Sequence, residues 1–149
     1  MSQFGTQISS DDIIETLSFF DDWEERYKYI IDLGRELPSL DAAQRTDEHL
    51  VRGCQSQVWL VSQQRDDRLF FDADSDAFIV KGLLAVVLAA YNGKRPADIR
   101  DFDIEQYFEQ LNLIKHLSVT RGNGLRAMVK RIQETAAAAL QSPAEAGAQ

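Results

Sequence analysis

The residue with the clearest capacity for chemistry is Cys54, the only cysteine among 149 residues. It stands in the stretch GCQSQVW, residues 53–59, between a glycine and a polar run. Composition alone favours a buried cysteine that acts as a small hydrophobe. The neighbours favour a loop instead, because Gly53 permits a sharp backbone bend and the cation Arg52 favours the reactive thiolate. The pattern therefore indicates a thiol that a loop presents.

A single thiol narrows the possible reactions, because it forms neither an intrachain disulfide nor an intrachain cysteine zinc cluster. A cysteine hydrolase or thiol peroxidase stays open as an alternative, and it would need a base within hydrogen-bond reach. The histidines are His49 and His116, and both fit surface or capping positions better. Thiol exchange needs only an accessible thiolate and a docking partner, so sulfur exchange is the leading hypothesis.

Two other constellations are candidate ligand sites. Asp72, Asp74 and Asp76 alternate as in a calcium loop, but the expected glycine and final glutamate are missing. We interpret them as a solvated strand end, followed by a helix that Ser75 or Asp76 caps. The stretch SVTRGNGL, residues 118–125, fits either an anion site or close packing at a helix start. No metal site or cofactor is predicted.

The elements that must position Cys54 follow from hydrophobic patterning. Apolar runs at 58–61 and 69–71 predict a hairpin about the polar turn SQQRDDR, and residues 49–52 add a short strand. Helical spacing predicts two capped helices before the hairpin and an almost wholly apolar, buried helix over 77–91. Further helices should start at Pro96, after Asp103 and near Thr120. The predicted fold class is α+β, with a small antiparallel sheet of about three strands packed by helices from both chain ends.

Composition limits the function further. The net charge of −8 and the pI near 4.7 argue against a nucleic-acid partner. The longest apolar run is too short for a membrane span, and we see no signal or transit peptide at the N-terminus. The lone cysteine fits a reducing compartment, so we expect a cytoplasmic protein. The length fits one domain over residues 1–149, with residues 1–9 and 141–149 flexible.

Four stretches together resemble the SufE family. They are WEERYKYIIDLGRELP (23–38), GCQSQVW (53–59), DSDAFIVKGLLAVVLAAYNG (74–93) and HLSVTRGNGLRAMV (116–129). The resemblance spans residues 13–135 and implies a fold similar to the IscU/NifU scaffold. It also implies a sulfur carrier and activator rather than an enzyme. In this interpretation, Cys54 takes sulfur from the cysteine desulfurase SufS by transpersulfuration and passes it to the SufBCD scaffold for iron–sulfur cluster assembly.

The resemblance also implies a wider site around Cys54. The acceptor-loop residues are Gly53, Gln55, Ser56 and Gln57, and the partner-docking residues are Asp76 and Arg121. Phe78 and Gly122 depart from the family pattern, outside the cysteine motif. The alternative is the sister family CsdE, which serves a paralogous desulfurase. The run Gln55-Ser56-Gln57 after the cysteine favours the SufE family.

Three further points stay open on the sequence. A structural adaptor without chemistry is a third hypothesis, and a homodimer is neither required nor excluded. Because an idle persulfide carrier must avoid overoxidation, we expect the Cys54 thiol to be shielded in the free protein, with its loop swinging outward on docking.

Overall fold

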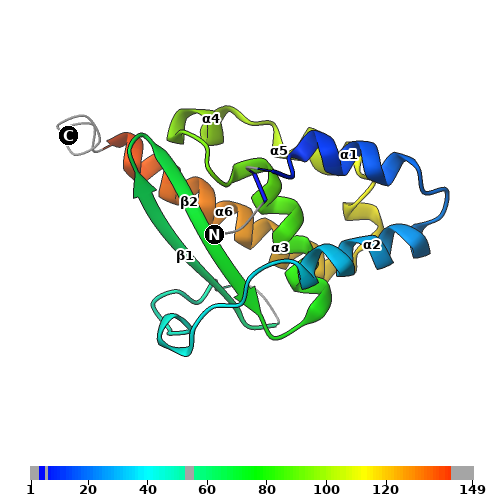
Figure 1. Ribbon diagram of the computed structural model, residues 1–149, viewed down its shortest axis with the longest axis horizontal. Helices are drawn as coiled ribbons and strands as arrows, with labels where there is room; N and C mark the ends of the chain where they lie inside the picture. The colour runs from blue at the N-terminus through cyan, green and yellow to red at the C-terminus, as the bar shows by residue number, and fades with distance from the viewer. Residues whose placement is uncertain (1–3, 6, 53–55, 142–149) are drawn as a thin grey trace.

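The computed structural model describes residues 4–5, 7–52 and 56–141. It places a long β-hairpin along one side of the molecule and the helices on the other (Figure 1). This confirms the predicted α+β class. In chain order the elements are α1 (Ser10–Ser18), α2 (Trp23–Arg35), the 3-10 turn η1 (Ala42–Gln44), β1 (Val58–Arg65), β2 (Arg68–Ser75), α3 (Phe78–Tyr91), α4 (Pro96–Asp101), α5 (Ile104–Gln110), the 3-10 turn η2 (Ile114–His116) and α6 (Val119–Gln141).

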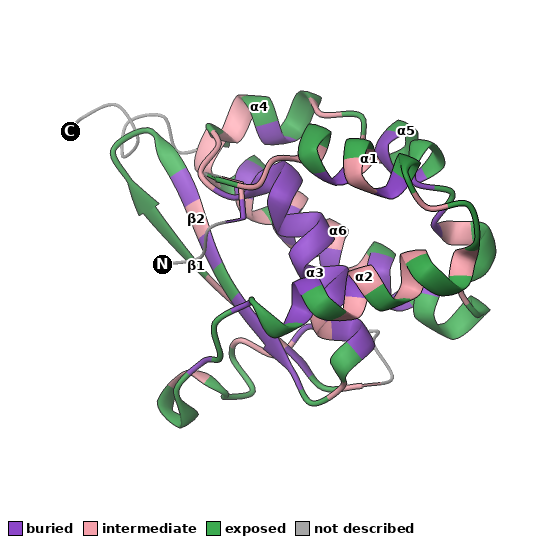
Figure 2. Cartoon of the chain, turned by 45° about the vertical axis from the view of Figure 1, so that its right-hand side comes forward, coloured by how far each residue is buried: buried purple, intermediate pink, exposed green. Residues whose placement is uncertain are grey.

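Helix α3 is the centre of the core, as its apolar sequence predicted. Apart from Phe78 and the half-buried Lys81, every residue of the helix is buried, and Figure 2 shows it enclosed by other elements. It contacts α1, α2, α6 and β2. A helix that is apolar on all sides is stable only when neighbours cover each side. The remaining elements are thus arranged around α3, and its first turn has a fixed place in the molecule.

Two glycines allow α2 and α3 to approach closely. A Cβ atom built on Gly82 would lie 2.2 Å from the carbonyl oxygen of Ile30. A Cβ atom on Gly34 would lie 2.5 Å from the backbone nitrogen of Gly82. Both distances are far below van der Waals contact, so no larger residue fits at this crossing. Gly82, which interrupts the apolar run in the sequence, is therefore a packing residue.

The hairpin is longer than its apolar residues predicted. The strands pair antiparallel from Val58 with Ser75 to Arg65 with Arg68, so two residues make the turn instead of the predicted polar stretch SQQRDDR. Asp66 adopts a positive φ of 57°, a conformation that aspartate tolerates. The predicted long turn was wrong because residues 62–65 are exposed strand residues, and they lack the apolar alternation that signals a strand.

The predicted third strand is reduced to one isolated bridge between Leu50 and Trp59. A bend and a turn at residues 46–49 lead into the bridge, and two hydrogen bonds pair the backbone with β1, from Val51 N–H to the carbonyl oxygen of Val58 and from Leu60 N–H to that of His49. Among the described residues the sheet therefore has two strands, and the expectation of about three was wrong. The turns leave too little extended chain for a ladder.

Within the described ranges, no helix combines the length and the apolar character that crossing a bilayer would require.

Candidate functional site

The predicted site divides into described and undescribed residues. Gly53, Cys54 and Gln55 lie outside the described residues, so the expected shielding of the Cys54 thiol stays a prediction. The residues on either side are described. Arg52 is exposed before the gap, and half-buried Ser56 and exposed Gln57 follow it. The site is therefore built from these flanks and from the elements that hold them.

Gln57 is fastened to the junction between β2 and α3. The backbone N–H of Gln57 donates to Asp76 Oδ1 over 3.1 Å, and the backbone N–H of Asp76 donates to the carbonyl oxygen of Gln57 over 3.4 Å. The buried Ser75 adds a hydrogen bond from Oγ to the same carbonyl oxygen, at 2.7 Å. Asp76, a predicted docking residue, is thus joined to the chain three residues after Cys54.

These bonds overturn the predicted helix cap. Helix α3 begins at Phe78 with Ala77 as its N-cap residue, and no side chain caps that end. Asp76 accepts from Gln57, while Ser75 Oγ accepts from Ala77 N–H over 3.2 Å and also donates to Gln57. The prediction that Ser75 or Asp76 caps α3 was wrong, because both side chains hold Gln57.

A small cavity brings Ser56 together with Arg121. Its volume is about 80 Å³, and it lies where the early turns of α3 and α6 meet the segment after Cys54. Apolar side chains from both helices line it together with the polar groups of Ser56, Thr120 and Arg121. This cavity is far smaller than the roughly 300–1,000 Å³ of small-molecule sites, so it suits the end of one side chain. The lining residues are Ser56, Val80, Leu83, Thr120, Arg121, Gly124, Leu125 and Met128.

The stretch SVTRGNGL forms the start of α6. Ser118 Oγ accepts from Arg121 N–H over 3.2 Å, and the helix begins at Val119. The two glycines differ, since Gly124 lines the small cavity whereas a Cβ on Gly122 would meet none of the described neighbours within 4 Å. Close packing against the described residues therefore does not account for Gly122.

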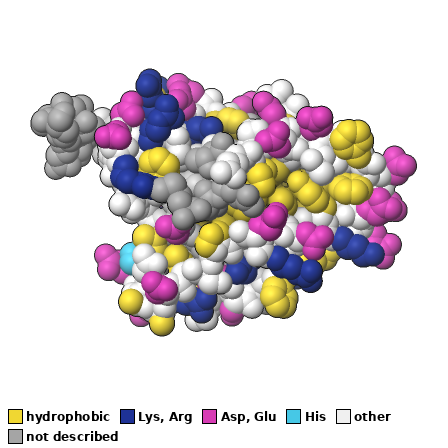
Figure 3. All heavy atoms as spheres, viewed as in Figure 1, with side chains coloured by type: hydrophobic (Ala, Val, Ile, Leu, Met, Phe, Trp, Pro, Cys, Tyr) yellow, Lys and Arg dark blue, Asp and Glu magenta, His cyan; other side chains and the backbone are white. Residues whose placement is uncertain are grey.

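Exposed apolar side chains begin both helices that line the cavity. Phe78, the first residue of α3, is 74% exposed, and Val119, the first of α6, is 81% exposed. We call these two residues, with Ser56, Gln57, Asp76 and Arg121, the acceptor face. Figure 3 shows a different feature of the surface, acidic and basic side chains interspersed over the side in view. The acceptor face thus combines apolar and charged groups around the cavity.

Both histidines make local structural contacts. His49 Nδ1 lies 3.0 Å from the carbonyl oxygen of Gln44 and 3.2 Å from Thr46 Oγ1. The His116 ring stacks on Trp23, with 4.3 Å between ring centroids. These contacts favour the interpretation of both side chains as structural residues.

Asp74 is a buried carboxylate that the sequence interpretation placed in solvent. It is 1% exposed and accepts backbone hydrogen bonds from Leu40 at 3.0 Å and Ser75 at 2.8 Å. It also accepts from Arg45 and pairs with Lys81 Nζ at 3.3 Å. The solvated assignment was wrong for Asp74, because the loop after α2 covers this end of β2. Burial raises the pKa of Asp74, but these hydrogen bonds and the cation lower it by more, so the pKa lies below 3.8.

We expect Asp74→Asn to lower the free energy of unfolding at neutral pH by about 2–3 kcal/mol, the scale of hydrogen bonds to a charged group. Because folding lowers the pKa of Asp74, its stabilisation is complete above the ordinary value of 3.8 and is lost as the pH falls through the folded value. The difference between variant and wild type should therefore shrink in strong acid. Urea titrations across this range measure it, with Asp32→Asn, which is exposed and paired with Arg35, as the control. A deficit independent of pH would contradict the assignment.

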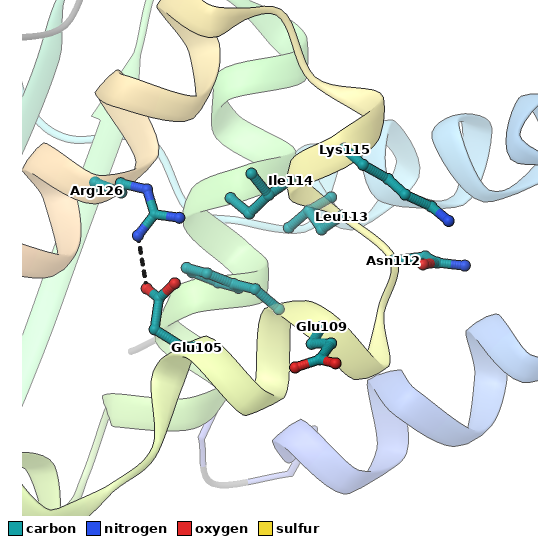
Figure 4. A pocket seen from close by; sticks show the side chains of 8 residues that line it. Glu105, Glu109, Asn112, Leu113, Ile114, Lys115 and Arg126 are labelled. Carbon is teal, nitrogen blue, oxygen red and sulfur yellow. Dashed lines mark hydrogen bonds and ion pairs between the residues drawn. The ribbon is translucent and has the colours of Figure 1, made fainter.

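A larger pocket of about 330 Å³ lies elsewhere, between α5, η2 and α6 (Figure 4). On one side of it Arg126 pairs with Glu105, with 2.8 Å between Nη1 and Oε2, and Lys115 and Asn112 lie on the other side. The pocket shares none of its lining residues with the small cavity. It therefore forms no part of the acceptor face.

Comparison with known proteins finds relatives over most of the chain. A family model described as "SufE: Fe-S metabolism associated domain" matches residues 11–136. An uncharacterized SufE-like protein from Rhizobium etli is 49% identical over 132 residues, which covers 86% of this chain and 89% of the relative. A second uncharacterized SufE-like protein, from Rhizobium meliloti, is 47% identical over 132 residues, which covers 86% of this chain and 94% of the relative.

A solved structure shares the fold. The solution structure of a hypothetical protein from Thermus thermophilus superposes with a TM-score of 0.72. It has 16% sequence identity and covers 89% of this chain and 96% of that chain. At this level of identity the likeness supports the arrangement of helices and hairpin, and nothing about chemistry.

Proposed function

We propose, because this chain belongs to the SufE family and so to proteins associated with iron–sulfur metabolism, that it accepts sulfur from a cysteine desulfurase and carries it as a persulfide on Cys54. One observation supports this proposal above the others. Ser56 and Gln57, which follow the cysteine, lie with Asp76 and Arg121 on one face although these residues are far apart in sequence. That face is where a presented thiol would meet a partner protein.

The chemistry of uptake needs only the Cys54 thiolate and the partner. The thiolate attacks the terminal sulfur of a persulfide on the desulfurase cysteine. An S–S bond forms at Cys54 as the S–S bond on the desulfurase breaks, and the electron pair leaves with the desulfurase cysteine as a thiolate. The transferred sulfur keeps its proton. Neither an external oxidant nor a reductant is required, and the desulfurase is freed for another turnover.

A carrier fits the site better than an enzyme with its own substrate. A cavity of about 80 Å³ holds only a few atoms, which suits a thiol or persulfide end and excludes a free amino acid as a fully enclosed ligand. We therefore assign the chain no reaction of its own and no cofactor. In this proposal one SufE-like domain, residues 1–149, works in the cytoplasm with a SufS-like desulfurase and passes its sulfur to a SufBCD-like scaffold.

The test of this function uses a cysteine desulfurase with L-cysteine and a thiol reductant. Sulfide release is measured while the concentration of the present protein is raised. If Cys54 clears the desulfurase persulfide, the rate should rise and saturate, because the carrier removes the group that blocks the next turnover. A desulfurase rate that stays constant at all concentrations would contradict the proposal.

The acceptor face also predicts a docking effect. Exposed aromatic residues are frequent anchors at protein interfaces, so Phe78→Ser should raise the carrier concentration for half-maximal stimulation about tenfold. The maximal rate should stay the same, because Phe78 does not line the small cavity.

Phe19→Ser is the matched control for this docking effect. Phe19 is 75% exposed, almost the same as Phe78, but it follows α1 and belongs to none of the elements that line the small cavity. Equal shifts in the two variants, or no shift in Phe78→Ser, would show that Phe78 does not mark the docking face.

A further inference from the structure

One arginine joins α6 to the chain segment that precedes Cys54. Arg131 is half-buried on α6, and its guanidinium makes two hydrogen bonds to backbone carbonyl oxygens. Nη1 donates to Leu50 over 3.3 Å, and Nη2 donates to Glu48 over 3.1 Å. A planar guanidinium fork can hold two acceptors at once, which a lysine ammonium on its flexible stem does less rigidly.

The same segment is also fixed from its other side. Val51 N–H donates to Val58 over 2.8 Å, and the carbonyl oxygen of His49 accepts from Leu60 N–H over 2.9 Å. Residues 48–51 are therefore held between β1 and α6. On the far side of the acceptor loop, Gln57 is held by Asp76. The chain thus leaves one fixed point and reaches another within a few residues on either side of Cys54.

Helix α6 links this anchor to the acceptor face. It carries Arg121 at the small cavity and Arg131 two to three turns further on, in one continuous helix. A movement of the segment 48–51 relative to α6 would therefore move the start of the acceptor loop relative to Arg121. A helix is stiff over this length, because a continuous ladder of backbone hydrogen bonds joins its successive turns.

We propose that Arg131 is a positioning residue for sulfur transfer. It fixes the backbone before Cys54 against α6 and so sets the place from which the thiol approaches the desulfurase persulfide. This inference rests on the proposed function, and the atoms of Arg131 take no part in the reaction. It acts through the carbonyl oxygens of Glu48 and Leu50.

The test separates the transfer step from docking. Arg131→Ala should lower the saturating single-turnover rate of sulfur transfer from a persulfidated desulfurase about tenfold, because misplacement of a reacting group slows attack strongly. The carrier concentration at half-saturation should stay the same. Arg131→Lys should recover part of the rate, since one ammonium can still reach one carbonyl oxygen.

A control and a second measurement keep the test decisive. Arg126→Ala removes another α6 arginine, which pairs with Glu105 at the larger pocket, and it should leave the transfer rate unchanged. In the free protein, amide hydrogen exchange at Val51 and Leu60 should be faster in Arg131→Ala than in wild type.

Three results would overturn the positioning role. They are an unchanged transfer rate in Arg131→Ala, an equal loss of rate in Arg126→Ala, and unchanged amide exchange in the free variant. The exchange measurement needs no desulfurase, so it tests the backbone-anchoring role of Arg131 even if no sulfur transfer is observed. Wild-type protein that takes up no sulfur would instead contradict the proposed function. If Arg131→Ala does not fold, circular dichroism will show it. The transfer rate and the amide exchange of Arg131→Lys are then compared with those of wild type instead.

Discussion

Cys54→Ser is expected to abolish stimulation of the desulfurase while the variant still binds it. A serine hydroxyl stays protonated at neutral pH and is a weak nucleophile, so it cannot replace the thiolate in attack on sulfur. The substitution changes one atom and leaves Asp76, Phe78 and Arg121 of the acceptor face in place. Loss of turnover with retained binding therefore separates chemistry from docking.

Two assays measure this effect. Sulfide release from L-cysteine reports stimulation, and isothermal titration of the desulfurase with carrier reports binding. Ser62→Ala, at an exposed position on β1, is the control and should behave as wild type in both. Full stimulation by Cys54→Ser would favour the structural adaptor, a protein that activates its partner without carrying sulfur.

Gly82→Ala should produce the largest loss of stability, lowering the free energy of unfolding by about 3 kcal/mol or more, at the upper end for overpacked cores. In a helix alanine is about 1 kcal/mol more favourable than glycine, so helix propensity alone would predict that Gly82→Ala is more stable than wild type. Packing decides the outcome, because the new Cβ would lie 2.2 Å from the carbonyl oxygen of Ile30 and 2.8 Å from its Cγ2. Because the contacting oxygen belongs to the helical backbone at Ile30, it cannot move away locally, and α2 and α3 would have to separate.

Gly122→Ala provides the matched comparison. Both glycines lie inside helices, but a Cβ on Gly122 would meet none of the described neighbours within 4 Å. Urea unfolding should show Gly122→Ala as stable as wild type or more stable by up to about 1 kcal/mol, through helix propensity. If Gly82→Ala unfolds at the same urea concentration as Gly122→Ala, the close contact between α2 and α3 is not as described.

The helices could be predicted because their signals are local. Ser9, Asp22 and Asp103 each accept a hydrogen bond from the backbone three residues on, at the start of α1, α2 and α5. The hairpin was harder, since the outer half of β1, residues 62–65, is exposed on both faces and has no apolar alternation. A two-residue turn at Asp66 and Asp67 leaves little sequence signal beyond two aspartates.

The sequence singles out one residue of the candidate site but does not reveal partners that are distant along the chain. Cys54 stands out by its neighbours, but no spacing rule places Ser56 beside Arg121. Asp74 and Arg131 were missed because they bind backbone groups 34, 81 and 83 positions away.

The local strand pattern predicts the wrong environment for Asp74. Along β2 every second residue from Leu69 to Ala73 is buried, so alternation predicts an exposed Asp74. The backbone N–H of Leu40 reaches this carboxylate, and the loop that carries Leu40 covers the strand end. Tertiary contact therefore overrides the local pattern at this position.

The most direct measurement of the central claim is the intact mass of this protein after incubation with a cysteine desulfurase and L-cysteine. Cys54→Ser is treated in parallel, and half of each sample is reduced before analysis. We predict that the wild type gains the mass of one sulfur atom, that reduction removes it, and that the variant gains nothing. A wild type that stays at its unmodified mass beside an active desulfurase would contradict sulfur carriage on Cys54.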